Sequence, residues 1–367
     1  MKVSEWFKSI LESTRKLLHS GSDIIMPPYL QGVTPRSIYV MVESKTSDPL
    51  TVDYGETVAF GNHASTHSVE TTTEDTYVHR ILLTGLKPNM CYHYQVRGYH
   101  GAYTFHTAVN PGTPFRFAWM ADFRSGPKVH DQIATLIREA QPRVSFYGGD
   151  ISRRSRYDVY KEDFFRPPQQ ALIARVPFFN ATGNHEGWSV NTRAFTQGPP
   201  GMPDDGYYSV DYGDLHVLVL NNEIDYQPGS PQYEFAQKDL ARTTRRWKMV
   251  INHKPPYGAG GHGENEGMKV MATHIFEPNK VDLVLSGHSH FYQHNLVNGI
   301  HYLIIGSAGS PLYTPEKAPY TLKSVKDYNY AITDVSPTSL QMTVYNHEKK
   351  VLDQLRLTKN ANQSLAR

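Results

Sequence analysis

The spacing of hydrophobic and polar positions changes twice along the chain. Over residues 1–22, apolar side chains recur at helical spacing with charged ones on the opposite side, which predicts an amphipathic helix. Over residues 23–110 the period is two, as in 37–42 and 92–96, and segments rich in Gly, Pro, Asp and Thr separate the runs. Short strands at such spacing predict an all-β sandwich.

Beyond a linker at residues 110–114, apolar runs alternate with helical stretches, which indicates an α/β or α+β domain over residues 115–358. Five short apolar runs predict buried strands, at 115–120, 144–147, 176–179, 249–251 and 281–285. Helices are expected over 130–140 and 234–243, and three further strands over 330–335, 339–345 and 351–357. We therefore expect a mixed sheet system covered by helices, followed by a tail over 359–367.

Composition narrows the class of protein. The 367 residues are 39% hydrophobic and carry a formal charge of +2, so no strongly basic surface argues for a nucleic-acid partner. Cys91 is the only cysteine, which excludes an internal disulfide and any cysteine-based metal site. No apolar run approaches the length of a membrane span, and charged residues interrupt the apolar positions near the N-terminus. Cytoplasmic location is the default expectation, and a secreted protein without its leader would look the same.

The N-terminal amphipathic stretch has more than one interpretation. Packing of residues 1–22 on the rest of the protein is favoured. Docking to a membrane surface and dimerisation are the alternatives. A homodimer is therefore one of the expectations.

Metal-binding side chains follow the five strand-like runs, mostly next to glycine. They lie in Asp122, Gly149-Asp150, Gly183-Asn184-His185-Glu186, Asn252-His253 and Gly287-His288-Ser289-His290. If these strands share one sheet, its C-terminal edge carries oxygen and nitrogen donors where open α/β sheets bind ligands. Any one block could be turn chemistry, but five in order, each after a strand, favour a functional site.

The residue types in these blocks indicate the metal. Carboxylate, amide oxygen and imidazole without thiolate suit Zn, Mn, Fe or Ni and contain too much nitrogen for a calcium site. One carboxylate can bridge two cations, and Asp150 is the candidate bridge. We define a first metal position, formed by Asp122, Asp150 and His290, and a second, formed by Asp150, Asn184, His253 and His288.

The order Asp, Gly-Asp, Gly-Asn-His-Glu, His, Gly-His-x-His resembles the metallophosphoesterase superfamily. The strand-rich N-terminal part, the block Asn252-His253-Lys254-Pro255-Pro256-Tyr257 and the downstream His262 make residues 27–357 most similar to purple acid phosphatases. Residues 86–92 resemble a signature of fibronectin type III domains, with Tyr92 as the corner tyrosine. The resemblance implies a fibronectin type III-like N-terminal sandwich and a catalytic β-sandwich flanked by helices, with metals at its edge.

This resemblance also implies an activity, namely hydrolysis of phosphate monoesters by a metal-bound hydroxide with one or two Fe, Zn or Mn ions. His185 resembles the family's histidine that binds phosphate or protonates the leaving group, and His262 is expected to share that role. Asn184 and Arg124 are the other candidates for substrate contact. The alternatives are a phosphodiesterase with the same metal site, or a binding or signalling protein with a degenerate first metal position.

Two positions depart from the family pattern. Arg124 stands where purple acid phosphatases have glycine, and Arg153 stands where they have the tyrosine whose phenolate binds ferric iron and gives the colour. A guanidinium group has no free lone pair, so neither arginine can replace a metal ligand. For Arg124, phosphate contact and electrostatic replacement of a metal both stay open. Tyr157 and Tyr160 are the nearby tyrosines that could supply a phenolate instead.

Overall fold

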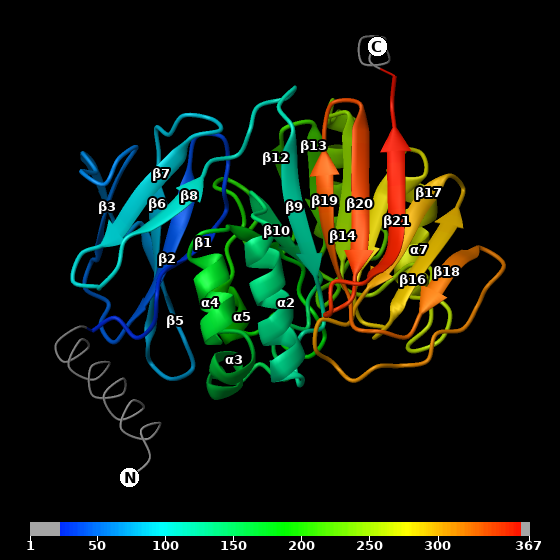
Figure 1. Cartoon of the computed structure of the whole chain (residues 1–367), viewed down its shortest axis with the longest axis horizontal. Coiled ribbons are helices and arrows are strands. Elements are labelled where there is room, and N and C mark those ends of the chain that lie inside the picture. The colour runs from blue at the N-terminus through cyan, green and yellow to red at the C-terminus, as the bar shows by residue number, and fades with distance from the viewer. Residues whose placement is uncertain (1–22, 361–367) are drawn as a thin grey trace.

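The computed structural model describes residues 23–360, which form three sheets and several short helices (Figure 1). In order of pairing, the ten-stranded sheet contains β21 (Val351–Thr358), β20 (Ser339–Tyr345), β19 (Tyr330–Val335), β9 (Phe115–Met120), β10 (Val144–Tyr147), β11 (Phe178–Asn180), β1 (Tyr29–Gln31), β2 (Ile38–Ser44), β6 (Tyr77–Leu83) and β5 (Ser68–Thr71). The seven-stranded sheet contains β12 (Tyr208–Tyr212), β13 (Leu215–Val219), β14 (Trp247–Asn252), β15 (Leu283–Ser286), β17 (Ile300–Ile305), β16 (Tyr292–Val297) and β18 (Thr321–Val325). The four-stranded sheet contains β4 (Asn62–Ser65), β3 (Thr51–Gly55), β7 (Cys91–Val96) and β8 (Tyr103–His106).

The described helices are short, and three of them begin at a residue whose side chain caps the first turn. Ser230, for example, caps α6 through its side chain, which accepts from the Tyr233 amide, and Pro231 occupies the first turn. The helices are α2 (Pro127–Glu139), α3 (Tyr157–Asp163), α4 (Pro167–Ile173), α5 (Val190–Phe195), α6 (Pro231–Arg242) and α7 (Glu266–Met271), the last continued by a π-helical turn, η1 (Ala272–Phe276).

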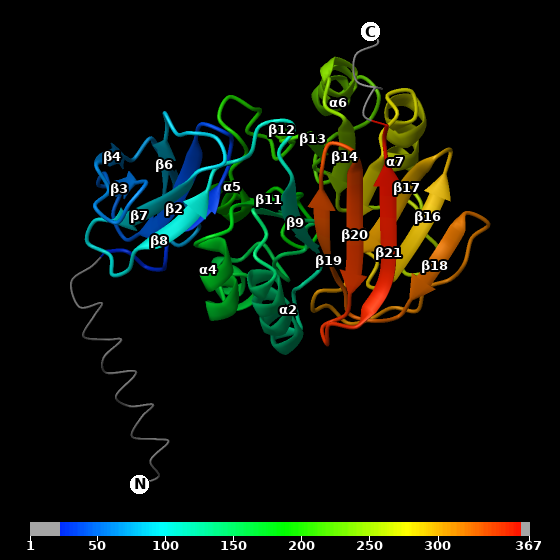
Figure 2. The ribbon, with the colours of Figure 1, turned by 45° about the horizontal axis from the view of Figure 1, so that its top comes forward.

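The two large sheets pack face to face (Figures 1 and 2). Alternate side chains along their strands therefore enter different cores. Phe117 and Trp119 of β9 pack with Met249 of β14 in the core between the sheets. Ala118 and Met120, on the other face of β9, belong to a second core that α2, α3 and α4 cover. A third core lies between the seven-stranded sheet and helices α6 and α7. The mixed sheet system covered by helices is therefore confirmed.

The donor-bearing strands belong to two sheets, so the condition that they share one sheet is not met. Strands β9, β10 and β11 pair in parallel within the ten-stranded sheet. Strands β14 and β15 pair in parallel within the seven-stranded sheet. Apolar runs specify burial, whereas strand partners are decided by long-range register and packing that no local pattern records. The site is therefore assembled where strand ends of two packed sheets meet.

The N-terminal part is strand-rich, as predicted. The hydroxyl of Tyr92 accepts a hydrogen bond of 3.0 Å from the Lys87 amide, which is the contact of a corner tyrosine. Strand β1 pairs antiparallel with β2 and parallel with β11, so one hydrogen-bonded sheet runs from the N-terminal strands into the C-terminal part. The domain bounds 23–110 and 115–358 stay predictions.

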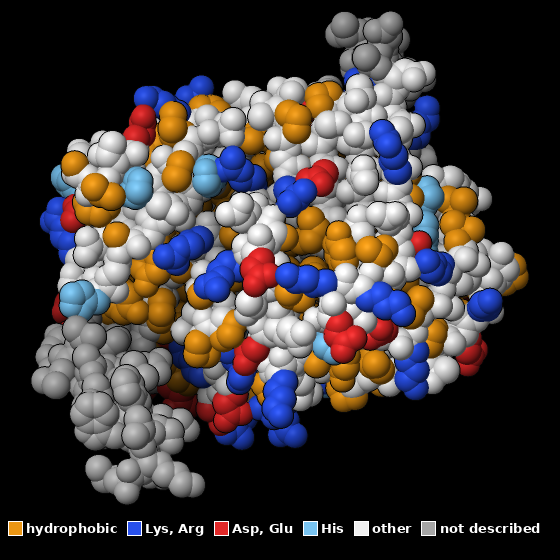
Figure 3. All heavy atoms as spheres, in the orientation of Figure 1, with side chains coloured by type: hydrophobic (Ala, Val, Ile, Leu, Met, Phe, Trp, Pro, Cys, Tyr) orange, Lys and Arg blue, Asp and Glu red, His pale blue; other side chains and the backbone are white. Residues whose placement is uncertain are grey.

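The expected amphipathic helix over residues 1–22 lies outside the described residues, as does the tail from residue 361. The dimer and membrane-docking interpretations that rest on this helix stay predictions, and so does the cellular location. Among the described residues, no helix has the length and apolar character to cross a membrane. On the face drawn in Figure 3, Lys and Arg side chains are interspersed with Asp and Glu, in keeping with a formal charge near balance.

Candidate metal centre

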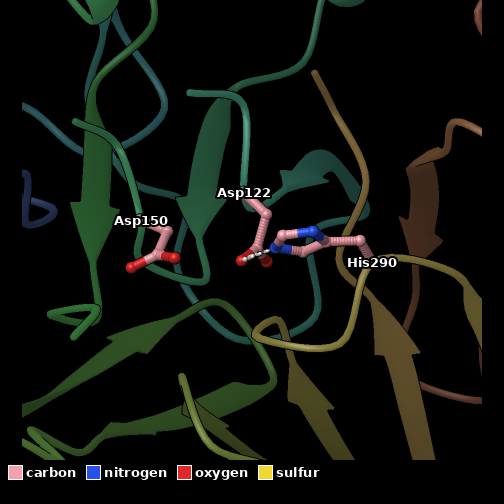
Figure 4. A group of neighbouring side chains, drawn as sticks. All are labelled: Asp122, Asp150 and His290. Atoms are coloured by element: carbon pink, nitrogen blue, oxygen red, sulfur yellow. Dashed lines mark ion pairs between the residues drawn. The ribbon is translucent and has the colours of Figure 1, made fainter. Parts of the chain in front are cut away.

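Every sequence-predicted donor follows a strand end at one junction of the two sheets. Asp122, Asp150 and Asn184 follow β9, β10 and β11, while His253 and His288 follow β14 and β15. The structure brings all of them together, as the distances below show. Figure 4 shows the first metal position, where the side chains of Asp122 and His290 point toward each other and Asp150 lies beside them.

The backbone at the donors is held in an uncommon conformation. Asp122, Asp150 and His288 have positive φ values of 55°, 53° and 69°, in the left-handed region where side chains other than glycine are rare. Such conformations persist where surrounding structure imposes them, and they cluster at functional sites. Gly183 is required by close approach, since a Cβ there would lie 2.3 Å from Asp150 Oδ1. The strand-end glycines thus let the donor loops touch.

Four donor atoms converge at the second metal position. The Nε2 atom of His253 lies 3.0 Å from Asn184 Oδ1, 3.2 Å from His288 Nδ1 and 3.4 Å from Asp150 Oδ1. His253 Nδ1 lies 2.7 Å from the Gly148 carbonyl oxygen, which can only accept, so Nδ1 carries the hydrogen and Nε2 presents its lone pair. Burial, with the nearby His253 and His262, lowers the pKa of His288 to about 2 and keeps this imidazole neutral. Oxygen and nitrogen lone pairs therefore face one point, an arrangement that fits a cation.

At the first metal position, Asp122, Asp150 and His290 have ligand atoms within 4.8 Å of one another. His290 Nδ1 donates to the Pro311 carbonyl oxygen at 2.8 Å, which leaves Nε2 as an acceptor 3.4 Å from Asp122 Oδ1. By distance alone these three residues could hold a second metal ion.

Arg124 lies among the donors of the first metal position. Its Nε donates to Asp150 Oδ2 at 2.9 Å, and its Nη2 lies 3.5 Å from His290 Nε2. Burial of Asp150 would raise its pKa, but its interactions with the His253 ring, the Arg124 guanidinium and His185 outweigh burial and lower the pKa of this carboxyl to about 2. Asp150 is therefore a carboxylate throughout the physiological pH range.

The two candidate catalytic histidines border the donors. The backbone amide of His185 donates to Asp150 Oδ1 at 3.0 Å, and its Nδ1 lies 3.0 Å from the Arg153 carbonyl oxygen. The ring of His262 stacks on that of His288, with centroids 4.2 Å apart. Burial is the main reason that the pKa of His262 is lowered, so His262 is neutral at neutral pH, which favours a hydrogen-bonding role.

Glu186 ties two of the donor loops together. Its Oε1 accepts from the amides of Asp150 and Gly183 at 3.0 and 2.8 Å. These two contacts fix the backbone around Asp150. Burial and the charge of Asp150 raise the pKa of Glu186 well above its usual range.

Two residues near the site were not identified from the sequence. Asn222 Oδ1 accepts from the amides of His253 and Lys254 at 3.0 and 2.8 Å, and so positions the His253 loop. Tyr313 stacks on His290 with ring centroids 4.2 Å apart. Asn222 follows the buried run that ends at Leu220, the same signal that identified the donors, whereas nothing local marks Tyr313.

The chain matches two protein families in succession. The family described as purple acid phosphatase, N-terminal domain, matches residues 28–109, and calcineurin-like phosphoesterase matches residues 115–292. This pair of domains makes the chain purple acid phosphatase-like. The fibronectin type III label fits the N-terminal domain only loosely, because the matching family is the purple acid phosphatase N-terminal one.

Individual relatives agree with this assignment. Purple acid phosphatase 21 of Arabidopsis thaliana is 25% identical, over 71% of this chain and 66% of the relative. Fe(3+)-Zn(2+) purple acid phosphatase 12 of the same plant is 25% identical, over 66% of this chain and 57% of the relative. The purple acid phosphatase PPD1 from yellow lupin (Lupinus luteus) seeds shares the fold with a TM-score of 0.80 at 19% identity, over 94% of this chain and 76% of that one. The chain spans about half to two thirds of the length of the curated relatives it matches.

In the described part of the chain, the two tyrosines of the following helix, α3, are engaged away from the metal centre. The hydroxyl of Tyr157 donates to Glu43 Oε1 at 2.8 Å, and that of Tyr160 lies 2.6 Å from Thr192 Oγ1. Burial raises the pKa of both tyrosines, which disfavours a phenolate. Arg153, which occupies the family position, directs its guanidinium to Glu162 and Asp163.

An iron-loaded sample of this purple acid phosphatase-like protein should therefore lack the visible absorption band of iron tyrosinate. Loss of this hard anionic donor should also weaken any preference of the first metal position for ferric iron. Visible spectroscopy of the protein after addition of ferric iron checks the prediction. A purple sample that loses its colour in Tyr157→Phe or Tyr160→Phe would show that a displaced tyrosine has restored the ligand.

Proposed function

We propose that this protein is a metal-dependent hydrolase of phosphate monoesters. The observation that carries the proposal is the convergence of Asp150, Asn184, His253 and His288 donor atoms on one point at the junction of the two sheets. The family matches support the same activity, since both are to phosphoesterase or phosphatase domains.

The donor set supports iron, zinc or manganese at the second metal position. One carboxylate, one amide oxygen and two imidazoles suit these ions, and the name of one relative carries Fe(3+) and Zn(2+). When bound there, a cation would lower the pKa of water and offset charge on the phosphoryl oxygens. Asp150 and His253 would hold it from opposite sheets, so the geometry of the site depends on packing between the sheets.

His185 is proposed to move the proton. Its Nδ1 donates to the Arg153 carbonyl oxygen, so the ring presents Nε2, which lies 3.9 Å from Asp150 Oδ2. With both ring nitrogens protonated, His185 would give its Nε2 proton to the leaving oxygen of a phosphate ester bound beside Asp150, and the ring would return to the neutral form that keeps the Nδ1 hydrogen on the Arg153 carbonyl. The side chain is partly exposed, which leaves room for a substrate.

The remaining candidates for substrate contact are assigned by position. The amide of Asn184 presents Oδ1 to His253, so its NH₂ group is free to donate to a phosphoryl oxygen. His262, stacked on His288, borders the same space and would donate or accept as a neutral imidazole. Arg124 is engaged with Asp150 and would offset substrate charge from that place.

Turnover of a monoester and a diester by the full chain tests the proposal. The metal-replete protein should hydrolyse p-nitrophenyl phosphate faster than bis-p-nitrophenyl phosphate, and a chelator should remove both activity and metal. Faster diester turnover would contradict the monoester assignment. Bound metal without turnover of either ester would make the protein a binding module.

A further inference from the structure

The most informative departure from a two-metal centre is the place of the Arg124 guanidinium. It lies between Asp150 Oδ2, at 2.9 Å from Nε, and His290 Nε2, at 3.5 Å from Nη2. Both of these acceptors would have to contact a metal ion at the first position. Asp150 thus divides its two oxygens, with Oδ2 toward Arg124 and Oδ1 toward His253 of the second position.

This contact differs from an ordinary surface ion pair. The side chains of Arg124 and Asp150 are only 10% and 1% exposed, so the contact is largely shielded from water. His290 donates through Nδ1 to the Pro311 carbonyl oxygen, which fixes its Nε2 as an acceptor on the side of Arg124. The guanidinium therefore contacts the lone pairs of both Asp150 Oδ2 and His290 Nε2. Among the described residues, Asp150 Oδ2 also lies 3.9 Å from His185 Nε2.

The loop that carries Arg124 is fixed at the backbone, so the side chain begins from a constrained point. The Arg124 carbonyl oxygen accepts from Ser310 Oγ at 3.3 Å, and the Ser310 amide donates to the Asp122 carbonyl oxygen at 2.9 Å. Just beyond, Gly126 packs so closely on Gly309 that a Cβ would lie 1.9 Å from the Gly309 carbonyl oxygen. Movement of Arg124 out of the site would leave the buried Asp150 Oδ2 without this partner, which is costly for a buried carboxylate.

A metal ion and this guanidinium exclude each other. A zinc-like ion needs nitrogen and oxygen ligands at about 2.0–2.2 Å, through the lone pairs that Arg124 now contacts. The guanidinium cannot be deprotonated to relieve the repulsion between two adjacent cations. The second position keeps its own donors, because Asn184, His253 and His288 make no described contact with Arg124.

We propose that this chain holds a single metal ion, at the second position, and that the Arg124 guanidinium is the permanent cation of the first position. The inference rests on the metal site of the proposed function. It makes Asp150 a bridge between a guanidinium and a metal ion, and makes His290 a partner of arginine in place of a metal ligand.

Metal stoichiometry measured by elemental analysis tests the proposal without reference to activity. The wild-type chain, saturated with Zn²⁺ or Mn²⁺ and freed of excess, should retain one ion. Arg124→Gly, which installs the family's residue, should retain two. His290→Ala should leave the wild-type count unchanged but return the Arg124→Gly protein from two ions to one. Arg153→Gly is the matched control, since this arginine pairs with Glu162 and Asp163, and it should retain one ion.

Two ions in the wild-type chain, with a count that falls to one in His290→Ala, would overturn the proposal and show that Arg124 moves aside. A folded Arg124→Gly protein that still retains one ion would overturn it as well. Wild-type protein without any bound ion would instead refute the metal centre of the proposed function. If Arg124→Gly does not fold, the number of ions that the wild-type chain retains, and its change in His290→Ala, still test the proposal.

Discussion

Replacement of Asp150 by asparagine is expected to abolish metal retention and hydrolysis together. Its Oδ1 is the only carboxylate oxygen at the described second position, and its Oδ2 balances the charge of Arg124. Asparagine keeps the size of the side chain and tolerates the left-handed backbone at φ 53°. The substitution therefore removes the negative charge and the carboxylate ligand without adding backbone strain. Alanine at this position should give the same loss with added strain.

The expected loss of metal affinity and activity exceeds that for a residue that only hydrogen-bonds to a metal ligand. Mutation of such outer partners typically costs roughly 10–100-fold in metal affinity or activity, so loss of the ligand itself should cost more. Elemental analysis and p-nitrophenyl phosphate turnover measure the two effects. Asp131→Asn is the matched control, because Asp131 is an arginine-paired aspartate on α2 that bonds to Arg166. Near-wild-type turnover by metal-replete Asp150→Asn would defeat the site assignment.

Local sequence patterns predicted the strands that carry the candidate donors, two of the helices and the donors themselves. Strand β9 spans Phe115–Met120, as the apolar run predicted, and α2 differs from the expected 130–140 by a few residues at its start. Donors were visible because buried strands that end in Asp, Asn or His are a local signal. The same signal at Asn222 was overlooked, although this residue holds the His253 loop.

The sheet arrangement and the contacts of Arg124 could not be predicted in this way. That β9 to β11 and β14 to β15 lie in different sheets depends on pairing between residues far apart in the chain. Whether Arg124 faces substrate or the metal position depends on the loop that Ser310 and Gly309 fix, many residues away. Glu186 likewise accepts a hydrogen bond from the backbone amide of Asp150, which lies 36 residues earlier in the chain, and no local pattern predicts this contact.

Replacement of His185 by alanine should keep the metal ion and lower turnover by roughly 10²–10⁴-fold, the usual contribution of a positioned acid or base. The hydrogen bond that His185 makes to the metal site runs from its backbone amide to Asp150 Oδ1, and alanine retains this bond. The loss should therefore lie in kcat, with metal content unchanged. His63→Ala, at an exposed histidine on β4, is the control and should behave as wild type.

The choice of leaving group separates proton transfer from other roles of His185. p-Nitrophenolate is a stable anion that departs without a proton, whereas phenolate and alkoxides need one. Because the His185 Nε2 is placed to protonate the leaving oxygen, His185→Ala should lose more turnover with phenyl phosphate than with p-nitrophenyl phosphate. An equal loss with both esters would indicate that His185 binds the phosphoryl group in place of protonating its leaving oxygen. Loss of the metal ion in His185→Ala would show that this histidine is a ligand, and the proton-transfer role would then be wrong.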